Sequence, residues 1–577
     1  MSRWSLALVL FLLLNAVALW IVSMARFDRT PLASMGDLGL VPLLPPIFFA
    51  ALGVLTVSFA IFVTRRNPPA TIAILHFAVL VAVWHVTPAI LYGTPRYPYA
   101  YKHIGVGEYI QRLGSIDPHI DAYFNWPGFF ALNALVSDLA GLASPQALAV
   151  WAPVALSALT VAALVVLMRA LTNDPRWAWL AVWLYLLTNW VGQDYYAPQA
   201  LAYALHIALL AAFVGALGTR PRSPARRATA LALIVMLFGA IVAMHQLTPF
   251  VTLASILVLT LTGFGSPRSL PIVLIAMIMA WFTYMTQPYL AGHLGELLAS
   301  VGRLFDNINQ ATRVLASAGD IDLSPDRRLV LDVRQWLTLL LFGVAILGGI
   351  RRVRRGFVDW TAIILLLVPA SMIALQPYGG EIIMRVYLFS LPFLVWFAAA
   401  VVFPTPESGR HWAAPVVIGV MSAVAWSGSA LAFFGNESMN YIAPAEITAF
   451  DVIYDEAPTG SLVIAVTNNA PVRYRRYEQV AFTDLSAFAR ETGLQDVMAV
   501  DALASGIEAS VEASDRPAAY VVFTRSQAAN ARLFGLLPDV DLDELAERMQ
   551  ASSRFEAVLR NEAAAVFALV RPAEGTP

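Results

Sequence analysis

The chain has 577 residues, of which 59% are hydrophobic and only 13% charged, and it contains no cysteine. Soluble domains carry about 25% charged residues, so a deficit of this size excludes a water-soluble protein and indicates one that lies mainly in lipid. The formal net charge of −1 averages two unlike regions. The absence of cysteine excludes disulfide bonds, thiolate metal ligands and a cysteine nucleophile.

The hydrophobic segments predict a polytopic α-helical membrane protein. A helix needs roughly 20 apolar residues to cross the hydrocarbon layer, and windows of that length give about thirteen spans. The first segment is long for a signal peptide and lacks a small-residue cleavage site, so we interpret it as a retained span. The predicted spans are residues 5–24, 42–63, 71–92, 149–171, 177–191, 199–218, 228–245, 248–264, 269–288, 335–350, 360–376, 386–403 and 412–434.

Arginines in the short loops set the orientation. The positive-inside rule places loops rich in arginine in the cytoplasm, and with thirteen spans all of these loops fall on the same side as the N-terminus. The long loops 93–148 and 289–334 and the tail 435–577 then lie outside. The arginines are Arg3, Arg65, Arg66, Arg169, Arg176, Arg220, Arg222, Arg226, Arg227, Arg268, Arg351, Arg352, Arg354, Arg355 and Arg410.

The tail 435–577 differs from the rest of the chain in composition. Charge rises, and apolar runs bounded by turn residues or charges occur at 461–466, 518–523 and 563–570, as is typical of buried strands. Helix-like stretches lie between them at 486–492 and 541–552. The pattern predicts an extracytoplasmic α/β domain, and 104–113 and 131–142 are predicted as short surface helices in the first long loop.

Polar stretches interrupt the spans on the outer side only. They are residues 115–128, 192–199, 245–249 and 376–385. Because carboxylates, an arginine, aromatics and amides all face one side of the membrane, we expect an active site there rather than a set of passive anchors.

The first outer loop carries three acids, Glu108, Asp117 and Asp121. A partly desolvated carboxylate at the membrane boundary can have a raised pKa and act as a general base; the alternative is that these acids are simply solvated. The same loop supplies Arg96 and Lys102 as candidate cations for a phosphate. It also supplies the candidate substrate-binding residues His103, His119 and Trp126.

The second and third stretches hold further candidate substrate-binding residues. Asp194 follows Gln193 at the outer end of a helical hairpin, where it either faces a cavity or caps the helix that starts at Pro198. His245 and Gln246 lie between two spans with almost no connector. They either bind a ligand or satisfy backbone carbonyls near a proline.

Arg385 lies on the outer side, where the positive-inside rule disfavours it. It therefore needs an anionic partner, which is either Glu381, four residues earlier, or a lipid phosphate. Arg385 is therefore a candidate for binding phosphate, and Glu381 is a candidate for binding substrate.

Motifs for other chemistries are missing from the sequence. No metal-binding, P-loop, nucleophile-elbow or dinucleotide motif is present, although carboxylates near a phosphate can hold Mg²⁺ or Mn²⁺. The arginine clusters are topology signals rather than a nucleic-acid surface.

The outer face of a membrane has no pool of nucleotide-activated donors, so an enzyme there takes its activated group from lipid. A polyprenyl-phosphate sugar needs a groove for the isoprenoid, a cation for the phosphate and a carboxylate base for the acceptor hydroxyl. A single in-line displacement would invert the anomeric centre. The acceptor would be a glycan or glycolipid of the cell envelope.

The layout resembles the GT-C superfamily of integral-membrane glycosyltransferases. The short segments 117–130, 190–199 and 245–250 also resemble parts of actinobacterial-type membrane proteins placed near that superfamily, which implies a bacterial plasma membrane. The resemblance implies an acidic base in the first outer loop. In most of the superfamily that loop follows the first span, whereas here it follows the third, so either two spans have been added at the N-terminus or the loop is assigned wrongly.

Two rival functions remain open. A polysaccharide polymerase or ligase relies on outer arginines and a histidine but usually lacks a soluble C-terminal domain. A transporter or flippase of a lipid-linked saccharide would place ionisable groups near the bilayer midplane, whereas here polar groups concentrate at the outer ends of the spans.

Overall fold

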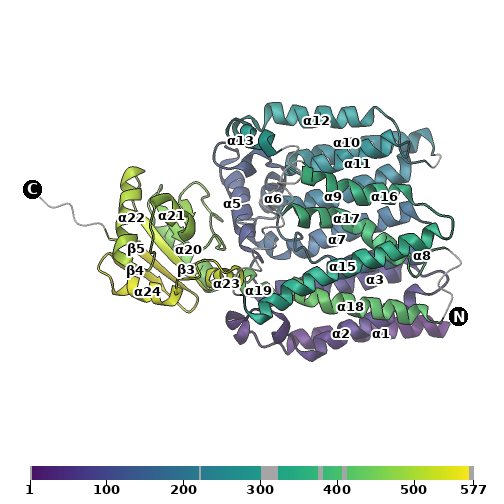
Figure 1. Cartoon of the computed structure of the whole chain (residues 1–577), viewed down its shortest axis with the longest axis horizontal. Coiled ribbons are helices and arrows are strands. Elements are labelled where there is room, and N and C mark those ends of the chain that lie inside the picture. Colours follow the sequence, from purple (N-terminus) through teal and green to yellow (C-terminus); the bar gives the residue numbers. More distant parts are fainter. Residues whose placement is uncertain (1–2, 220–221, 301–322, 375–380, 406–411, 571–577) are drawn as a thin grey trace, which may run out of the picture.

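The computed structural model describes residues 3–219, 222–300, 323–374, 381–405 and 412–570. Arg220, Arg410, residues 376–380 and much of the predicted loop 289–334 lie outside these ranges. The described helices form a bundle of nearly parallel rods, and a separate α/β domain sits against one end of it (Figure 1). We call this end of the bundle the domain end. The N-terminus lies at the opposite end.

The long helices of the bundle match nine of the predicted spans. Among the described residues, nine helices are long and apolar enough to cross a membrane. The stretch 70–92 combines α3 (Ala70–Val81), the π-helical turn η3 (Ala82–Val86) and α4 (Thr87–Tyr92). The other eight are α1 (Arg3–Ala25), α2 (Pro46–Val63), α7 (Gln146–Leu171), α9 (Pro198–Ala212) continued by η5 (Phe213–Leu217), α10 (Pro224–Met244), α15 (Pro325–Val353), α17 (Ile382–Ala399) and α18 (Ala414–Phe434).

The other four predicted spans are shorter helices, so the number thirteen stays a prediction. α12 bends by 95° against α13, and that pair would make a tenth span. α8 is buried along almost its whole length, which places it inside the bundle beside α17. The four are α8 (Pro175–Thr188), α11 (Thr248–Leu261), α12 (Leu270–Tyr284) with α13 (Gln287–Ser300), and α16 (Trp360–Leu367) with η6 (Val368–Ala374).

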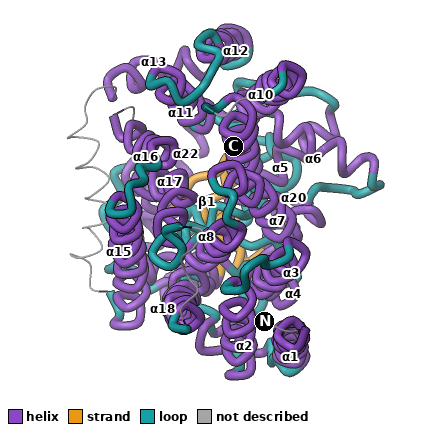
Figure 2. Tube along the Cα trace, turned by 90° about the vertical axis from the view of Figure 1, so that its right-hand side faces the viewer, coloured by secondary structure: helices purple, strands orange, loops and turns teal. Residues whose placement is uncertain are grey.

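The two N-terminal helices lie at the edge of the bundle. α1 packs along α2, and α2 packs on α18, so both helices appear at one margin in the end-on view (Figure 2). α1 leaves Phe11 and Leu14 more than 60% exposed, as expected for side chains that face lipid. This peripheral position favours the interpretation that two spans have been added before the first long loop.

The first long loop folds into helices at the domain end. α5 (Pro98–Leu113) and α6 (Gly128–Leu139) confirm the two predicted surface helices, with the short 3-10 turn η4 (Ala122–Asn125) between them. Two further 3-10 turns, η1 (Thr30–Ser34) and η2 (Val41–Leu43), connect α1 to α2. Proline at the first position of α5 explains its early start, because its fixed φ suits a helix N-terminus.

The C-terminal part is a five-stranded α/β domain, as predicted. The strand order is β2-β1-β3-β5-β4, with β1 parallel to β2 and β3, and β5 antiparallel to β3 and β4. The elements are α19 (Glu437–Asn440), α20 (Pro444–Glu456), β1 (Leu462–Ala465), β2 (Ala481–Asp484), α21 (Leu485–Thr492), α22 (Val500–Ala513), β3 (Ala519–Thr524), α23 (Arg525–Phe534), α24 (Leu542–Ala551), β4 (Phe555–Arg560) and β5 (Ala564–Leu569).

The two faces of the sheet belong to different cores. Leu462 and Ile464 of β1 pack with α21, α22 and α24. Val463 and Ala465, which alternate with them, join a core that also contains Tyr101 and Ile104 of α5. The α/β domain and the first long loop therefore share one hydrophobic core, which fixes the domain on the bundle.

The carboxyl ends of the parallel strands face the bundle. Arg525, after β3, donates to the backbone oxygens of Ser438 and Tyr441. In the segment after β1, the backbone oxygen of Arg473 lies so close to α5 that a Cβ on Gly105 would come within 1.6 Å of it. Only glycine at position 105 permits this approach.

Candidate active site

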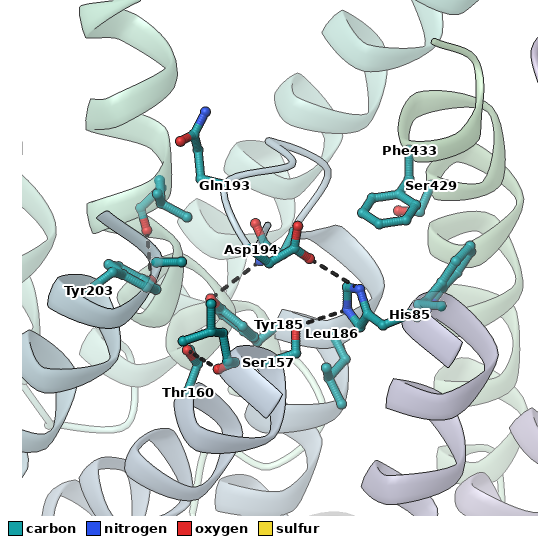
Figure 3. A pocket seen from close by; sticks show the side chains of 15 residues that line it. His85, Ser157, Thr160, Tyr185, Leu186, Gln193, Asp194, Tyr203, Ser429 and Phe433 are labelled. Atoms are coloured by element: carbon teal, nitrogen blue, oxygen red, sulfur yellow. Dashed lines mark hydrogen bonds and ion pairs between the residues drawn. The ribbon is translucent and has the colours of Figure 1, made fainter. Parts of the chain in front are cut away.

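A buried carboxylate borders a polar cavity at the domain end. Asp194 is 8% exposed and borders a cavity between η3, α7, α8, α9, α17 and α18. The side chains of His85, Ser157 and Asp194 meet in it (Figure 3). The cavity leaves about 30 Å³ for the centres of water molecules, enough for roughly two of them.

Local sequence explains why Asp194 points inward. α8 ends at Thr188, and the connector to α9 turns at Gly192, whose φ of +69° is accessible to glycine. α9 starts at Pro198 with Ala197 as its N-cap and no side-chain cap. Asp194 therefore does not cap α9. It faces a cavity instead, which was the other position predicted for it.

His85 and Ser157 form a polar chain with Asp194. Nδ1 of His85 lies 3.3 Å from Oδ2 of Asp194, and Nε2 of His85 lies 3.0 Å from Oγ of Ser157. The contact between Nδ1 and Oδ2 is an ion-pair distance and not a hydrogen bond, and the Ser157 hydroxyl can donate to or accept from Nε2, depending on the tautomer of His85. The imidazole ring of His85 therefore lies between the Asp194 carboxylate and the Ser157 hydroxyl.

Two oxygen atoms at the cavity have no hydrogen-bond partner among the described residues. They are Oδ1 of Asp194 and Oδ1 of Asn189. A buried acceptor without a partner costs about 1–3 kcal/mol. Such atoms are therefore expected to receive a donor from a ligand or water, and a hydroxyl group of a substrate satisfies either oxygen.

Arg334 supplies a cation at the same end of the bundle. Its guanidinium donates to the backbone oxygen of Ala432 at 3.0 and 2.7 Å and lies 5.6 Å from the ring centre of Trp190, beside the connector that carries Asp194. Within the described ranges it makes no ion pair with a carboxylate. Its charge is therefore available to an anionic ligand.

The two arginines that the sequence predicted to bind phosphate have protein partners. Arg96 is buried against Glu437, with Nε and Nη2 at 2.8 and 2.6 Å from the carboxylate. Arg385 binds Glu381 at 2.6 Å and also donates to Gln199. The Arg385–Glu381 pair is the ion pair that the sequence left as an alternative to a lipid phosphate.

The acids of the first loop lie at the junction with the α/β domain rather than at the cavity. Asp121 binds Nζ of Lys102 at 2.8 Å and accepts from Tyr477 at 2.9 Å. Glu108 accepts from Arg112 at 2.8 Å and from the backbone of Arg476. Asp117 accepts from the backbone of His119 in a local turn, and the side chain of His119 is exposed.

The remaining predicted residues lie around the same end. His103 donates to the backbone oxygen of Tyr196, which links the first loop to the Asp194 connector. Nδ1 of His245 accepts from the backbone of Leu247 and Thr248, so His245 caps α11. Gln193 and Gln246 are partly exposed, and the buried Trp126 packs on Tyr289.

Burial keeps both histidines neutral. It lowers the pKa of His103 to about 4 and that of His245 to about 3, and the charge of Arg385 acts on His245 in the same direction. A neutral ring has one nitrogen that donates and one that accepts, as the donation by His103 and the acceptance by His245 require.

We expect the junction between the first loop and the α/β domain to weaken in acid. Burial alone would raise the pKa of Asp121, but Lys102 and hydrogen bonds from Tyr123 and Tyr477 outweigh it and lower the pKa. A lowered folded-state pKa gives stability above the usual aspartate pKa and loses it as pH falls through the folded value. Hydrogen–deuterium exchange over residues 115–125, corrected for intrinsic rates, should rise below about pH 4. Asp121→Asn should exchange faster at neutral pH and remove this dependence; an unchanged profile contradicts the role of Asp121.

Sequence reasoning missed His85, Ser157, Asn189 and Arg334. An ionisable side chain inside a span is by default a functional candidate, and this signal would have selected His85. It would also have selected His76 and His206, which bind Ser58 and Thr252 inside the bundle. Arg334, like Arg385, lies on the predicted outer side, where the positive-inside rule disfavours an arginine, so the same argument would have selected it.

The bundle, the helical first loop and the C-terminal α/β domain together have a fold similar to that of a solved oligosaccharyltransferase. The oligosaccharyltransferase of Archaeoglobus fulgidus, tethered with an acceptor peptide containing the NVT sequon, superposes with a TM-score of 0.50 at 13% sequence identity, over 82% of this chain and 71% of that one. The same enzyme, AglB, in complex with an inhibitory peptide and a dolichol-phosphate gives 0.50 at 12% identity, over 82% and 72%.

A third solved structure, ArnT from Cupriavidus metallidurans bound to undecaprenyl phosphate, gives a TM-score of 0.47 at 15% identity, over 88% of this chain and 100% of that one. No sequence-family description matches the chain, and no curated protein matches it.

Proposed function

We propose that the protein is a membrane glycosyltransferase that moves a sugar from a polyprenyl-phosphate donor to a glycan or glycolipid acceptor of the cell envelope. The observation that carries this proposal is the buried Asp194, with one unpartnered oxygen, at the same end of the bundle as Arg334, which pairs with no carboxylate among the described residues. The fold supports the same class, since the oligosaccharyltransferase of similar fold was solved with a dolichol-phosphate.

In the proposed reaction Asp194 is the general base. Its Oδ1 takes the proton of the acceptor hydroxyl, and the oxygen then forms a bond to the anomeric carbon as the bond from that carbon to the phosphate oxygen breaks. The anomeric centre inverts. Arg334 offsets the charge on the departing phosphate, and His85 lies 3.3 Å from Oδ2 of Asp194.

The surroundings of the carboxylates favour Asp194 over Glu108, Asp117 and Asp121 as the base. Asp121 and Glu108 are each bound to a basic side chain, and the ion pair with Lys102 helps to lower the pKa of Asp121. Asp117 accepts from its own turn. We therefore propose that these acids shape the first loop and its contact with the α/β domain.

The proposal also says on which side of which membrane the reaction takes place. The arginine-rich loops lie at the end opposite the α/β domain, so we place that end in the cytoplasm of a bacterium and the cavity on the outer side of its plasma membrane. Hard cations such as Mg²⁺ or Mn²⁺ prefer oxygen ligands, and the two free oxygens of Asp194 and Asn189 are of that kind. Among the described residues no three acidic or histidine side chains cluster as a metal site.

The direct test uses purified protein in detergent with a radiolabelled polyprenyl-phosphate sugar and an envelope glycan. We expect one polyprenyl phosphate to be released for each sugar transferred. A transporter or flippase would give no transfer in micelles but would move the labelled lipid across the bilayer of sealed vesicles. Transfer of a whole oligosaccharide instead of one sugar would indicate a polymerase or ligase.

Replacing Arg334 should weaken donor binding. A hydrogen bond to a charged group contributes about 1.5–3 kcal/mol, so Arg334→Gln should raise the dissociation constant of the polyprenyl-phosphate sugar about 10- to 100-fold. Arg385→Gln, which removes an arginine already bound to Glu381 and Gln199, is the matched comparison. If Arg385→Gln weakens binding and Arg334→Gln does not, the phosphate is bound at Arg385 instead.

A further inference from the structure

A second cavity lies far from Asp194, toward the end opposite the α/β domain. It is a groove between α15, α16 and α17, which lie side by side in the end-on view (Figure 2). We call it the α15 groove and define it by Phe342, Ile346, Gly349, Val353, Leu394 and Phe397. It leaves about 210 Å³ for the centres of water molecules, far more than the cavity at Asp194.

The lining of the α15 groove suits hydrocarbon rather than water. Its side chains are almost entirely apolar, and Ile346 and Val353 are more than half exposed at its rim. Apolar cavities of this kind stay free of water because water finds no polar partners there. On a bundle surrounded by lipid, the occupant of an open apolar groove is an alkyl chain.

The groove ends at a pair of opposite charges. Nε and Nη2 of Arg352 lie 2.9 and 2.8 Å from the carboxylate of Asp359, and the guanidinium lies 4.2 Å from the ring centre of Phe357. Arg352 and Asp359 thus neutralise each other. They close the apolar groove with a polar wall and contribute no net charge.

Two arginines directly after this wall give the mouth of the groove a net positive charge. Arg354 and Arg355 are exposed, and neither side chain pairs with a carboxylate in the described part of the chain. Arginine binds phosphate groups well because its donors form a fixed fork. A basic segment at the end of a membrane helix attracts anionic headgroups with about 1 kcal/mol per residue.

The length of the groove selects among lipids. Phe342 and Arg352 are ten positions apart on α15, which corresponds to about 15 Å along the helix. This is half of the roughly 30 Å hydrocarbon thickness, the depth of one leaflet. The groove therefore fits an acyl chain of a phospholipid in that leaflet better than a long polyprenyl chain.

We propose that the α15 groove binds one acyl chain of an anionic phospholipid from the leaflet opposite the α/β domain, with its phosphate on Arg354 and Arg355. This site is separate from the cavity at Asp194, and the proposal does not depend on the reaction carried out there.

Native mass spectrometry of the purified full chain, titrated with phosphatidylglycerol or phosphatidylcholine, tests the proposal. We expect one phosphatidylglycerol to bind in preference to phosphatidylcholine. Gly349→Leu should fill the groove and abolish this binding, because a Cβ at position 349 already contacts Phe397 at 3.7 Å. Gly343→Leu is the matched control, since a Cβ there meets nothing within 4 Å.

A charge variant keeps the test decisive if Gly349→Leu fails to fold. Arg354→Gln with Arg355→Gln should weaken phosphatidylglycerol binding about 30-fold. Arg66→Gln with Arg226→Gln removes two exposed arginines at the same end and should leave binding unchanged. Equal affinity for the two lipids, equal loss in both arginine pairs, retention of polyprenyl phosphate in the groove, or detergent alone as occupant would each overturn the proposal.

Discussion

Asp194→Asn should abolish sugar transfer while leaving the protein folded. A general base contributes about 10²- to 10⁴-fold to a rate, and asparagine keeps the size and the contact with His85 but cannot take a proton. We therefore expect kcat to fall by about three orders of magnitude with little change in the affinity for the donor lipid. Single-turnover transfer from a labelled polyprenyl-phosphate sugar measures the rate, and binding of the same donor measures the affinity.

Other acids of the domain end provide the comparison. Asp138→Asn on the exposed face of α6 should have no effect. Asp117→Asn should retain transfer, and Asp121→Asn should lose activity only to the extent that the junction with the α/β domain loosens. If Asp121→Asn or Glu108→Gln removes activity in a stably folded protein and Asp194→Asn does not, the base lies in the first loop.

Glu437→Ala should be among the most destabilising substitutions in the chain. Glu437 is fully buried and accepts from Arg96, Tyr92 and Asn440, so it joins the end of α4 to α19. Removing one partner of a buried ion pair leaves an uncompensated charge and costs about 3–5 kcal/mol. The free energy of unfolding in detergent, measured by denaturant titration, should fall by about this amount.

An exposed pair of the same type provides the control. Glu544 and Arg548 are half exposed on α24, and such surface pairs contribute about 0–1 kcal/mol. Glu544→Ala should therefore change the free energy of unfolding only slightly. If Glu437→Ala and Glu544→Ala have similar small effects, the Arg96–Glu437 pair does not stabilise the domain end.

The lengths of the apolar segments predicted the helical bundle, but they did not predict which helices are long enough to cross a membrane by themselves. The nine long helices have the lengths that the apolar windows require. α8, α11, α12 and α16 are shorter, and glycine, proline or polar residues follow their last turns closely in the sequence. A sequence window cannot distinguish such a helix from a full span.

In the α/β domain, too, the sequence predicted only the elements that form continuous apolar runs. The three predicted strands became β1, β3 and β5, which lie inside the sheet and read as continuous apolar runs. The two strands that were missed, β2 and β4, form the sheet edges. β4 contains Glu556 and Arg560 among its apolar residues, as edge strands often do, so it lacks the run on which the prediction depended.

The sequence predicted that the candidate residues lie at one end of the bundle, where the structure has them, but it could not group them. His103 and Tyr196, and Arg385 and Gln199, are brought together by helix packing over more than ninety positions in the chain. Which carboxylate is left with a free oxygen depends on which side chains reach it after folding, as Lys102 and Tyr477 reach Asp121. That information is absent from any single segment.

The hydrophobic core shared by the α/β domain and α5 has a consequence for substrate entry. Gly105 and the segment after β1 touch so closely that the domain cannot tilt away from the membrane surface without breaking that core. A cavity with room for about two water molecules must nevertheless widen to admit a sugar. Under the proposed function, we therefore assign the widening to the connector between α8 and α9 and the helix ends beside it, with the α/β domain as a stationary platform for the acceptor.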